Sequence, residues 1–139
     1  MNIFDVAVLP KNRALPRWTV WAMLFGWMGL IFLFSNQSSL PQAPDAVLDT
    51  VLKKLAHATA YAILFVLWAR ALHSTGAFPS KRMLILALGL TICYAISDEW
   101  HQTFVSGRHG QLADVLVDTA GALLAFILAR RSSVKTPNR

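Results

Sequence analysis

The sequence predicts an all-α integral membrane protein, a bundle of four helices with an amphipathic interfacial segment leading into the second span. Two observations predict this fold. Of the 139 residues, 55% are hydrophobic and only 14% are charged, whereas a soluble domain carries about 25% charged residues. The apolar residues also form four runs of roughly the length that crosses a bilayer as a helix, about 20 residues. Because the connections between them are short, we expect one domain.

The first expected span covers residues 18–34, a stretch without a charged side chain. A leader, residues 1–17, precedes it. A signal peptide is the alternative interpretation, but its apolar region is about 7–15 residues long and ends at a small-residue cleavage site. Because this run is longer and no A-x-A pattern follows it, we favour a span that is retained.

The second span begins with an amphipathic segment that starts at Ala46. Its polar face carries Asp49, Lys53, Lys54 and His57. We expect this segment to lie along the membrane interface and then to turn inward as a span at about residues 55–72. The spacing of Lys54, His57 and Tyr61 places the three side chains on one helical face.

The third expected span begins after Lys81 and Arg82 and ends at about Ser97. A glycine-bearing loop, residues 103–111, leads to the fourth span at about residues 112–129. The third helix should carry one polar face, formed by Tyr94, Asp98, His101 and Gln102. One face of the fourth should carry Asp114 and Asp118, followed by the small residues Gly121, Ala122, Ala125 and Ala129. Small residues let membrane helices approach closely, so this face should point into the bundle.

The basic residues predict the orientation of the bundle. Four spans place the leader, the second loop and the tail, residues 130–139, on one side of the membrane. That side holds ten of the 13 Lys and Arg residues: Lys11, Arg13, Arg17, Arg70, Lys81, Arg82, Arg130, Arg131, Lys135 and Arg139. Since Lys and Arg are enriched in cytoplasmic loops, both termini are expected in the cytoplasm, with the domain at residues 18–129 between them.

The unusual polar residues then gather at the outer end of the bundle. The stretch from Ser97 to Gly121 reads S-D-E-W-H-Q-T-F-V-S-G-R-H-G-Q-L-A-D-V-L-V-D-T-A-G and holds four of the seven carboxylates: Asp98, Glu99, Asp114 and Asp118. Ionisable groups are expensive in a membrane, so they indicate a functional site by default. We expect a shared pocket in which Arg108, Lys54 and the histidines pair with the acids.

Three motifs together resemble the VanZ-like family of small bacterial membrane proteins, over about Trp18 to Ala129. They are F-S-N-Q-S, K-K-L-A-H-A-T-A-Y and the long acidic stretch above. The positions that fit are Ser35, Gln37, Lys54, His57, Tyr61, Asp98, Glu99, Gln102, Phe104, Arg108, Asp114 and Gly121. One position departs, because Asp118 stands where the family usually has asparagine.

The resemblance implies a location and a kind of ligand. The family is named after a protein linked to resistance to teicoplanin, a lipid-tailed glycopeptide that acts at the outer face of the membrane. We therefore expect a multi-pass protein of the bacterial cytoplasmic (inner) membrane, with an outward-facing site for a lipidic ligand.

Three interpretations of the polar cluster remain open. In the first, the charges only pair and set helix register, although buried ion pairs are poor stabilisers. In the second, the pocket binds an anionic lipid head group or a lipoglycopeptide, with Lys54 and Arg108 holding its oxyanions. The ligand-binding set would be Lys54, Arg108, Gln102, Gln37, Ser35, Tyr61, Asp114 and Asp118.

The third interpretation is catalysis, as a hydrolase or phosphotransferase acting on an outer-leaflet lipid phosphate. Two acids in a site of low dielectric can take different protonation states and serve as acid and base. Glu99 or Asp98 would be the base, and His101 or His57 the proton partner. Arg108 and Lys54 would stabilise the oxyanion. Ser35 could be a nucleophile, but a role at the helix end is the more ordinary interpretation.

The sequence predicts no cofactor and no nucleic-acid partner. It contains no H-E-x-x-H or Cys/His zinc spacing. A divalent ion held by Asp98, Glu99, His101, Asp114 and Asp118 is the alternative. The basic tail is interpreted as a determinant of topology, and a bundle this small could self-associate.

Overall fold

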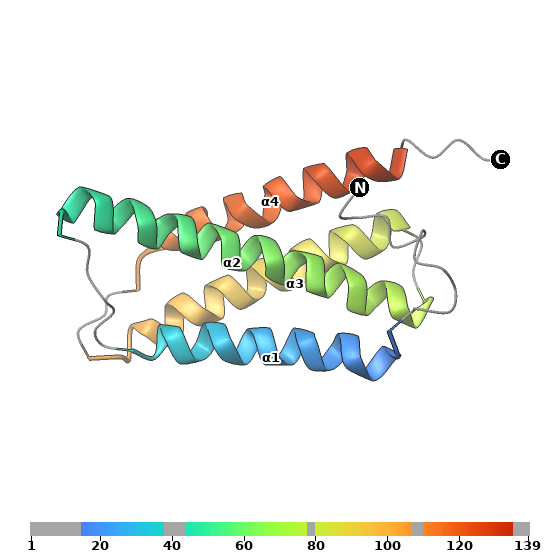
Figure 1. Cartoon of the computed structure of the whole chain (residues 1–139), viewed down its shortest axis with the longest axis horizontal. Helices are drawn as coiled ribbons and strands as arrows, with labels where there is room; N and C mark the ends of the chain where they lie inside the picture. Colours follow the sequence, from blue (N-terminus) through green and yellow to red (C-terminus); the bar gives the residue numbers. More distant parts are fainter. Residues whose placement is uncertain (1–14, 38–43, 78–79, 107–109, 135–139) are drawn as a thin grey trace.

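The computed structural model describes residues 15–37, 44–77, 80–106 and 110–134, which form four helices. These are α1 (Arg17–Ser35), α2 (Ala46–Thr75), α3 (Ser80–Gln102) and α4 (Leu112–Val134). Each helix runs antiparallel to the one before it (Figure 1). Each is also long and apolar enough to cross a membrane. The predicted all-α bundle is therefore confirmed, and the chain is a multi-pass membrane protein.

The second helix differs from the expectation of two segments with a turn near residue 55. α2 is one uninterrupted helix of 30 residues. The Asp45 side chain caps its N-terminus by accepting a hydrogen bond from the Leu48 amide at 2.8 Å, and Gly76 ends it in the left-handed conformation with φ 68°. No proline or glycine lies between these ends to break the helix. At about 1.5 Å per residue, α2 is roughly 45 Å long and exceeds a hydrocarbon core of about 30 Å.

α3 is longer than expected, because it continues past Ser97 to Gln102. The polar residues of this last turn do not break the helix, since Asp98 and Gln102 form hydrogen bonds with each other and with Ser35 of α1. α4 likewise continues past residue 129 to Val134.

α2 is the central helix of the bundle, since it packs extensively against each of the other three, whereas α3 contacts α1 only slightly. α1 lies on α2 and touches α3, and within the described residues it makes no contact with α4. α2 and α4 approach each other closely at Gly121, where an added Cβ would overlap the backbone of Ala58. Ala122, Ala125 and Ala129 continue this contact as buried small residues, which confirms the face predicted for the fourth helix.

Buried polar residues concentrate at one end of the bundle. We call it the polar end: α1 and α3 finish there, and α2 and α4 begin there, at the left of Figure 1. The buried polar side chains of this end are Ser35, Asp98, Glu99, Gln102 and Asp118. Thr91 is buried nearer the middle, and its hydroxyl donates to the Ala87 carbonyl of its own helix. The apolar core fills the remaining length, with Leu24, Leu64 and Phe65 fully buried.

Candidate functional site

Asp98 is the centre of a hydrogen-bond network that joins three helices. Its Oδ2 accepts from the Ser35 hydroxyl at 2.7 Å, from the Tyr61 hydroxyl at 3.2 Å and from the Gln102 amide at 3.2 Å. The Gln102 amide also donates to the Ser35 oxygen at 3.2 Å. All four side chains are buried, with Asp98 only 4% exposed. Every described donor to this carboxylate is therefore neutral.

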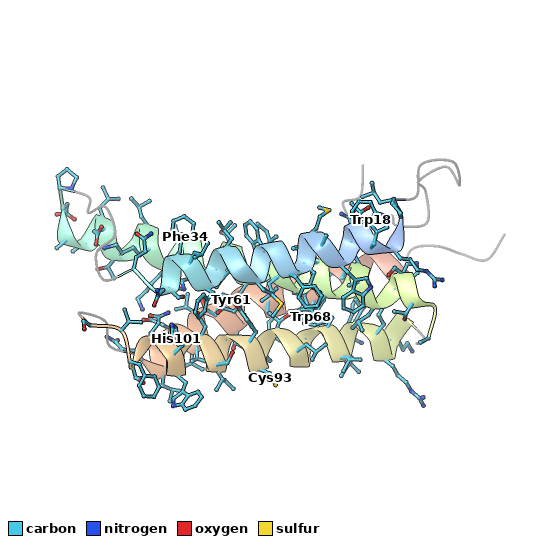
Figure 2. All side chains as sticks on the ribbon, turned by 90° about the horizontal axis from the view of Figure 1, so that it is seen from below. Trp18, Phe34, Tyr61, Trp68, Cys93 and His101 are labelled. Carbon is cyan, nitrogen blue, oxygen red and sulfur yellow. The ribbon has the colours of Figure 1, made fainter. Side chains whose placement is uncertain are left out.

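The secondary structure explains how these residues meet. Ser35 is the last residue of α1, and Asp98 and Gln102 lie one turn apart on α3, so both reach the end of α1. Tyr61 comes from the middle of α2, and Figure 2 shows it in the interior, between the ribbons of α1 and α3. The predicted polar face of α3 is thus directed at α1, because the Tyr94 hydroxyl also donates to a carbonyl of that helix, at 2.7 Å.

A second set of contacts joins α2 to α4. Lys54 Nζ lies 2.7 Å from Asp114 Oδ1, and His57 Nδ1 lies 3.4 Å from Asp118 Oδ1. The pairs match because residues 54 and 57 are nearly one turn apart on α2, as residues 114 and 118 are on α4. Asp118 is completely buried, and neither of its oxygens accepts a hydrogen bond from the described residues. Two of the predicted partners, a lysine and a histidine, therefore do pair with acids.

Glu99 points away from its neighbour Asp98, as successive residues of a helix do, about 100° apart. Its Oε2 accepts from the backbone amide of Gln111 at 2.9 Å, just before α4, and its Oε1 is buried without a partner in the described structure. The expected pairing of Glu99 or Asp98 with a histidine is not formed among the described residues. His57 pairs with Asp118 instead, and His101 packs on Phe32 of α1 with ring centroids 4.7 Å apart.

Two predicted site residues are left, Gln37 and Arg108. Gln37 is exposed just beyond α1, where its backbone amide donates to the Phe34 carbonyl at 3.3 Å. Arg108 lies outside the described residues. In the described part of the chain, no three His, Cys, Asp or Glu side chains are grouped as ligands for a metal ion.

Two grooves flank α1 at the polar end. The α1–α2 groove has a volume of about 300 Å³. Its apolar lining is Trp27, Leu30, Ile31, Phe34, Ala56 and Ala60, and its polar lining is Ser35, Lys53, His57 and Tyr61. The α1–α3 groove has a volume of about 260 Å³ and is lined by Phe32, Tyr94, Ser97, Asp98, Trp100, His101 and Phe104. The Ser35–Asp98 hydrogen bond joins the linings of the two grooves.

The family model described as VanZ/LLP1 matches residues 20–133, which include nearly all of the four helices. This chain belongs to the VanZ/LLP1 family. The resemblance predicted from the motifs is confirmed. Neither a curated protein nor a solved structure matches the chain.

The motif positions of this VanZ/LLP1 protein converge although they come from four helices. Ser35, Tyr61, Asp98 and Gln102 form the first network. Lys54, His57 and Asp114 belong to the second set of contacts, and Gly121 lies where α4 closely approaches α2. Asp118 faces His57, which places a buried carboxylate against a histidine that lines the α1–α2 groove.

Two residues of the VanZ/LLP1 site were missed from the sequence. Trp27 lines the α1–α2 groove, and its indole N–H donates to the Ala60 carbonyl at 3.0 Å. Its position in the middle of a span could have indicated this role. Tryptophan favours the membrane interfaces, and inside the bundle its indole N–H needs a hydrogen-bond partner. Lys53 also lines the groove, although the sequence indicated only a solvated face.

Proposed function

We propose that this VanZ/LLP1 protein binds an anionic membrane lipid in the α1–α2 groove. The observation that carries the proposal is the change in lining along the groove. One part is apolar, with Trp27 and Ile31 among its residues, and suits an acyl chain. The other part presents the side chains of Lys53 and His57, which suit a phosphate. Concave, mostly apolar sites with a few placed polar groups are the usual form of ligand sites.

Lys53, which lines the groove, and the adjacent Lys54 are both available to a ligand at low cost. Lys53 pairs with Asp49 at 2.6 Å and Lys54 with Asp114 at 2.7 Å, and the two lysine side chains are 38% and 42% exposed. Exposed ion pairs typically contribute only about 0–1 kcal/mol. An arriving phosphate could therefore replace either carboxylate as the partner of its lysine without a large loss of stability.

The proposed setting is the bacterial cytoplasmic membrane, with both termini in the cytoplasm and the polar end facing outward. The excess of Lys and Arg on the opposite side supports this orientation. A lipid-tailed glycopeptide such as teicoplanin would reach the same groove from outside. Competition between such an antibiotic and an anionic lipid would link the site to glycopeptide resistance.

Quenching of Trp27 by brominated acyl chains tests the proposal. The protein is placed in phosphatidylcholine nanodiscs that contain equal small fractions of brominated phosphatidylglycerol or brominated phosphatidylcholine. We expect stronger quenching by the anionic lipid, and we expect Trp27→Phe to remove that excess. Lys53→Ala should reduce it, whereas Lys81→Ala, an exposed lysine at the other end of the bundle, should not. Equal quenching by the two lipids in the unmodified protein would contradict the proposal.

The antibiotic is tested in the same sample. Teicoplanin added to the brominated phosphatidylglycerol nanodiscs should restore Trp27 emission if it occupies the groove. Unchanged emission at saturating antibiotic would mean that the groove binds membrane lipids but not teicoplanin.

A second candidate function, acid–base catalysis on a lipid phosphate, is favoured by the His57–Asp118 contact. A histidine oriented by a carboxylate is the common arrangement of a general base. His57 lines the same groove as the Ser35 hydroxyl. Incubation with a short-chain phosphatidylglycerol, followed by mass spectrometry, should then reveal a cleaved or transferred head group that His57→Gln abolishes. Binding without product would support the first function and remove this one.

A further inference from the structure

We propose that the α1–α3 groove is a second binding site, which takes the primary ammonium group of an aminophospholipid such as phosphatidylethanolamine. The site lies on the other side of α1 from the proposed anionic-lipid groove. It has the opposite charge, and the described linings of the two grooves share no residue. Its occupancy therefore does not depend on the function proposed above.

The walls of the α1–α3 groove are aromatic. Phe32 comes from α1, whereas Tyr94 and Trp100 come from α3 and Phe104 follows it. Trp100 and Phe104 are in edge contact, with centroids 5.6 Å apart, yet they remain 68% and 71% exposed. A cation within about 6 Å of such ring faces is attracted by the π electrons, by roughly 0.5–2 kcal/mol. The walls thus suit a positively charged group.

The floor of this groove carries a negative charge that lacks a described counter-ion. Among the residues that the structure describes, Asp98 is the only acidic side chain in the lining, and none of the described lining residues is a lysine or arginine. Its three described donors, Ser35, Tyr61 and Gln102, are all uncharged. Buried carboxylates are usually paired with a cation, because an isolated charge is costly away from water. An ammonium group in the groove would supply that missing charge.

The hydrogen-bonding groups of the groove favour a primary over a quaternary ammonium. Figure 2 shows His101 at the polar end, on the side of α3 that faces α1. Its Nε2 is buried and has no hydrogen-bond partner among the described residues. The Tyr94 hydroxyl donates to the Met28 carbonyl at 2.7 Å, so its oxygen keeps lone pairs that can accept. A primary ammonium has three N–H donors for such acceptors, whereas a choline group has none.

The dimensions suit a head group. A volume of about 260 Å³ is close to the lower limit of small-ligand sites, about 300 Å³. The alternative explanation is that Trp100 and Phe104 only anchor the protein at the membrane interface, as exposed aromatics do. That explanation assigns no part to the carboxylate of Asp98. The two explanations can therefore be distinguished by asking whether lipid binding depends on the negative charge of Asp98.

The test compares lipids that differ only in the head group. Short-chain phosphatidylethanolamine and phosphatidylcholine with identical chains are titrated into the full-length protein in neutral detergent, and Kd is measured by calorimetry. We expect the ethanolamine lipid to bind about tenfold more tightly, as a desolvated cation–carboxylate contact warrants. Equal affinity for the two lipids would overturn the proposal.

Two variants locate the site. Asp98→Asn keeps the shape of the side chain but removes its charge, and it should bring the two affinities to within about twofold of each other. Trp100→Ala changes an exposed residue, leaves the buried network intact and should weaken phosphatidylethanolamine binding several-fold. Phe25→Ala, an exposed aromatic of α1 outside both grooves, should have no effect. Retention of the ethanolamine preference in both Asp98→Asn and Trp100→Ala would overturn the assignment to this groove.

Discussion

The hydroxyl of Ser35 donates a 2.7 Å hydrogen bond to the carboxylate of Asp98, which lies 63 residues further along the chain. α1 packs mainly on α2, and its contact with α3 is small. Three described hydrogen bonds connect α1 to α3: Ser35 to Asp98, Gln102 to Ser35, and Tyr94 to the Met28 carbonyl. The α1–α3 groove is lined by residues of this same contact. The first link thus joins the two candidate binding sites and also holds the first helix in place.

Ser35→Ala should therefore destabilise the protein. The substitution leaves the buried Asp98 carboxylate with one fewer donor, and an unsatisfied buried polar group costs about 1–3 kcal/mol. Thermal unfolding in detergent measures the effect. Ser97→Ala is the matched control, because the Ser97 hydroxyl is exposed and donates to the Tyr94 carbonyl within its own helix. Equal melting temperatures for the two variants would show that the network contributes nothing to stability.

Asp118→Asn should preserve or raise the stability of the bundle. Neither Asp118 oxygen accepts a hydrogen bond from the described residues, and a neutral amide of the same shape is cheaper to bury than a carboxylate. His57→Ala should lower the stability, because it leaves the buried acid without its partner. The double variant should resemble Asp118→Asn alone. Additive effects in this double-mutant cycle would contradict a direct interaction between the two side chains.

Gly121→Ala should separate α2 from α4, because the added methyl group would overlap the backbone of Ala58. Overpacking of this kind typically costs about 1–3 kcal/mol. Gly89→Ala is the control: an added Cβ there meets open space, and alanine favours a helix by about 0.5–1 kcal/mol. Melting temperatures should therefore move in opposite directions. A fall of similar size in both variants would mean that helix approach at Gly121 is not the cause.

Lys54→Met should change stability little, because the pair with Asp114 is partly exposed. Unfolding of the unmodified protein and the variant at low and high salt checks this. Any small difference seen at low salt should shrink as screening increases. A loss comparable to that of His57→Ala would show that Lys54 is a structural residue rather than one available to a ligand.

The sequence alone predicted the parts of this protein that depend on local properties. The length and apolarity of each run predicted four spans, because a helix that crosses lipid must satisfy its own backbone. Helical periodicity predicted that Tyr94, Asp98, His101 and Gln102 share a face, and that face meets α1. The motif order predicted the family, and the family match confirms it. The predicted helix boundaries were less accurate where an apolar run passes gradually into polar residues, as at the end of α3.

Only the tertiary structure decided which polar groups are partners. Asp98 and Glu99 are adjacent and chemically alike, yet one binds the end of α1 and the other the amide of Gln111 before α4. His57 faces Asp118 rather than Glu99. Periodicity gives the face on which a side chain lies, but its partner depends on the rotation and approach of the neighbouring helix, which packing sets. For the same reason, the two grooves could not be predicted, since each is a gap between helices that are distant in sequence.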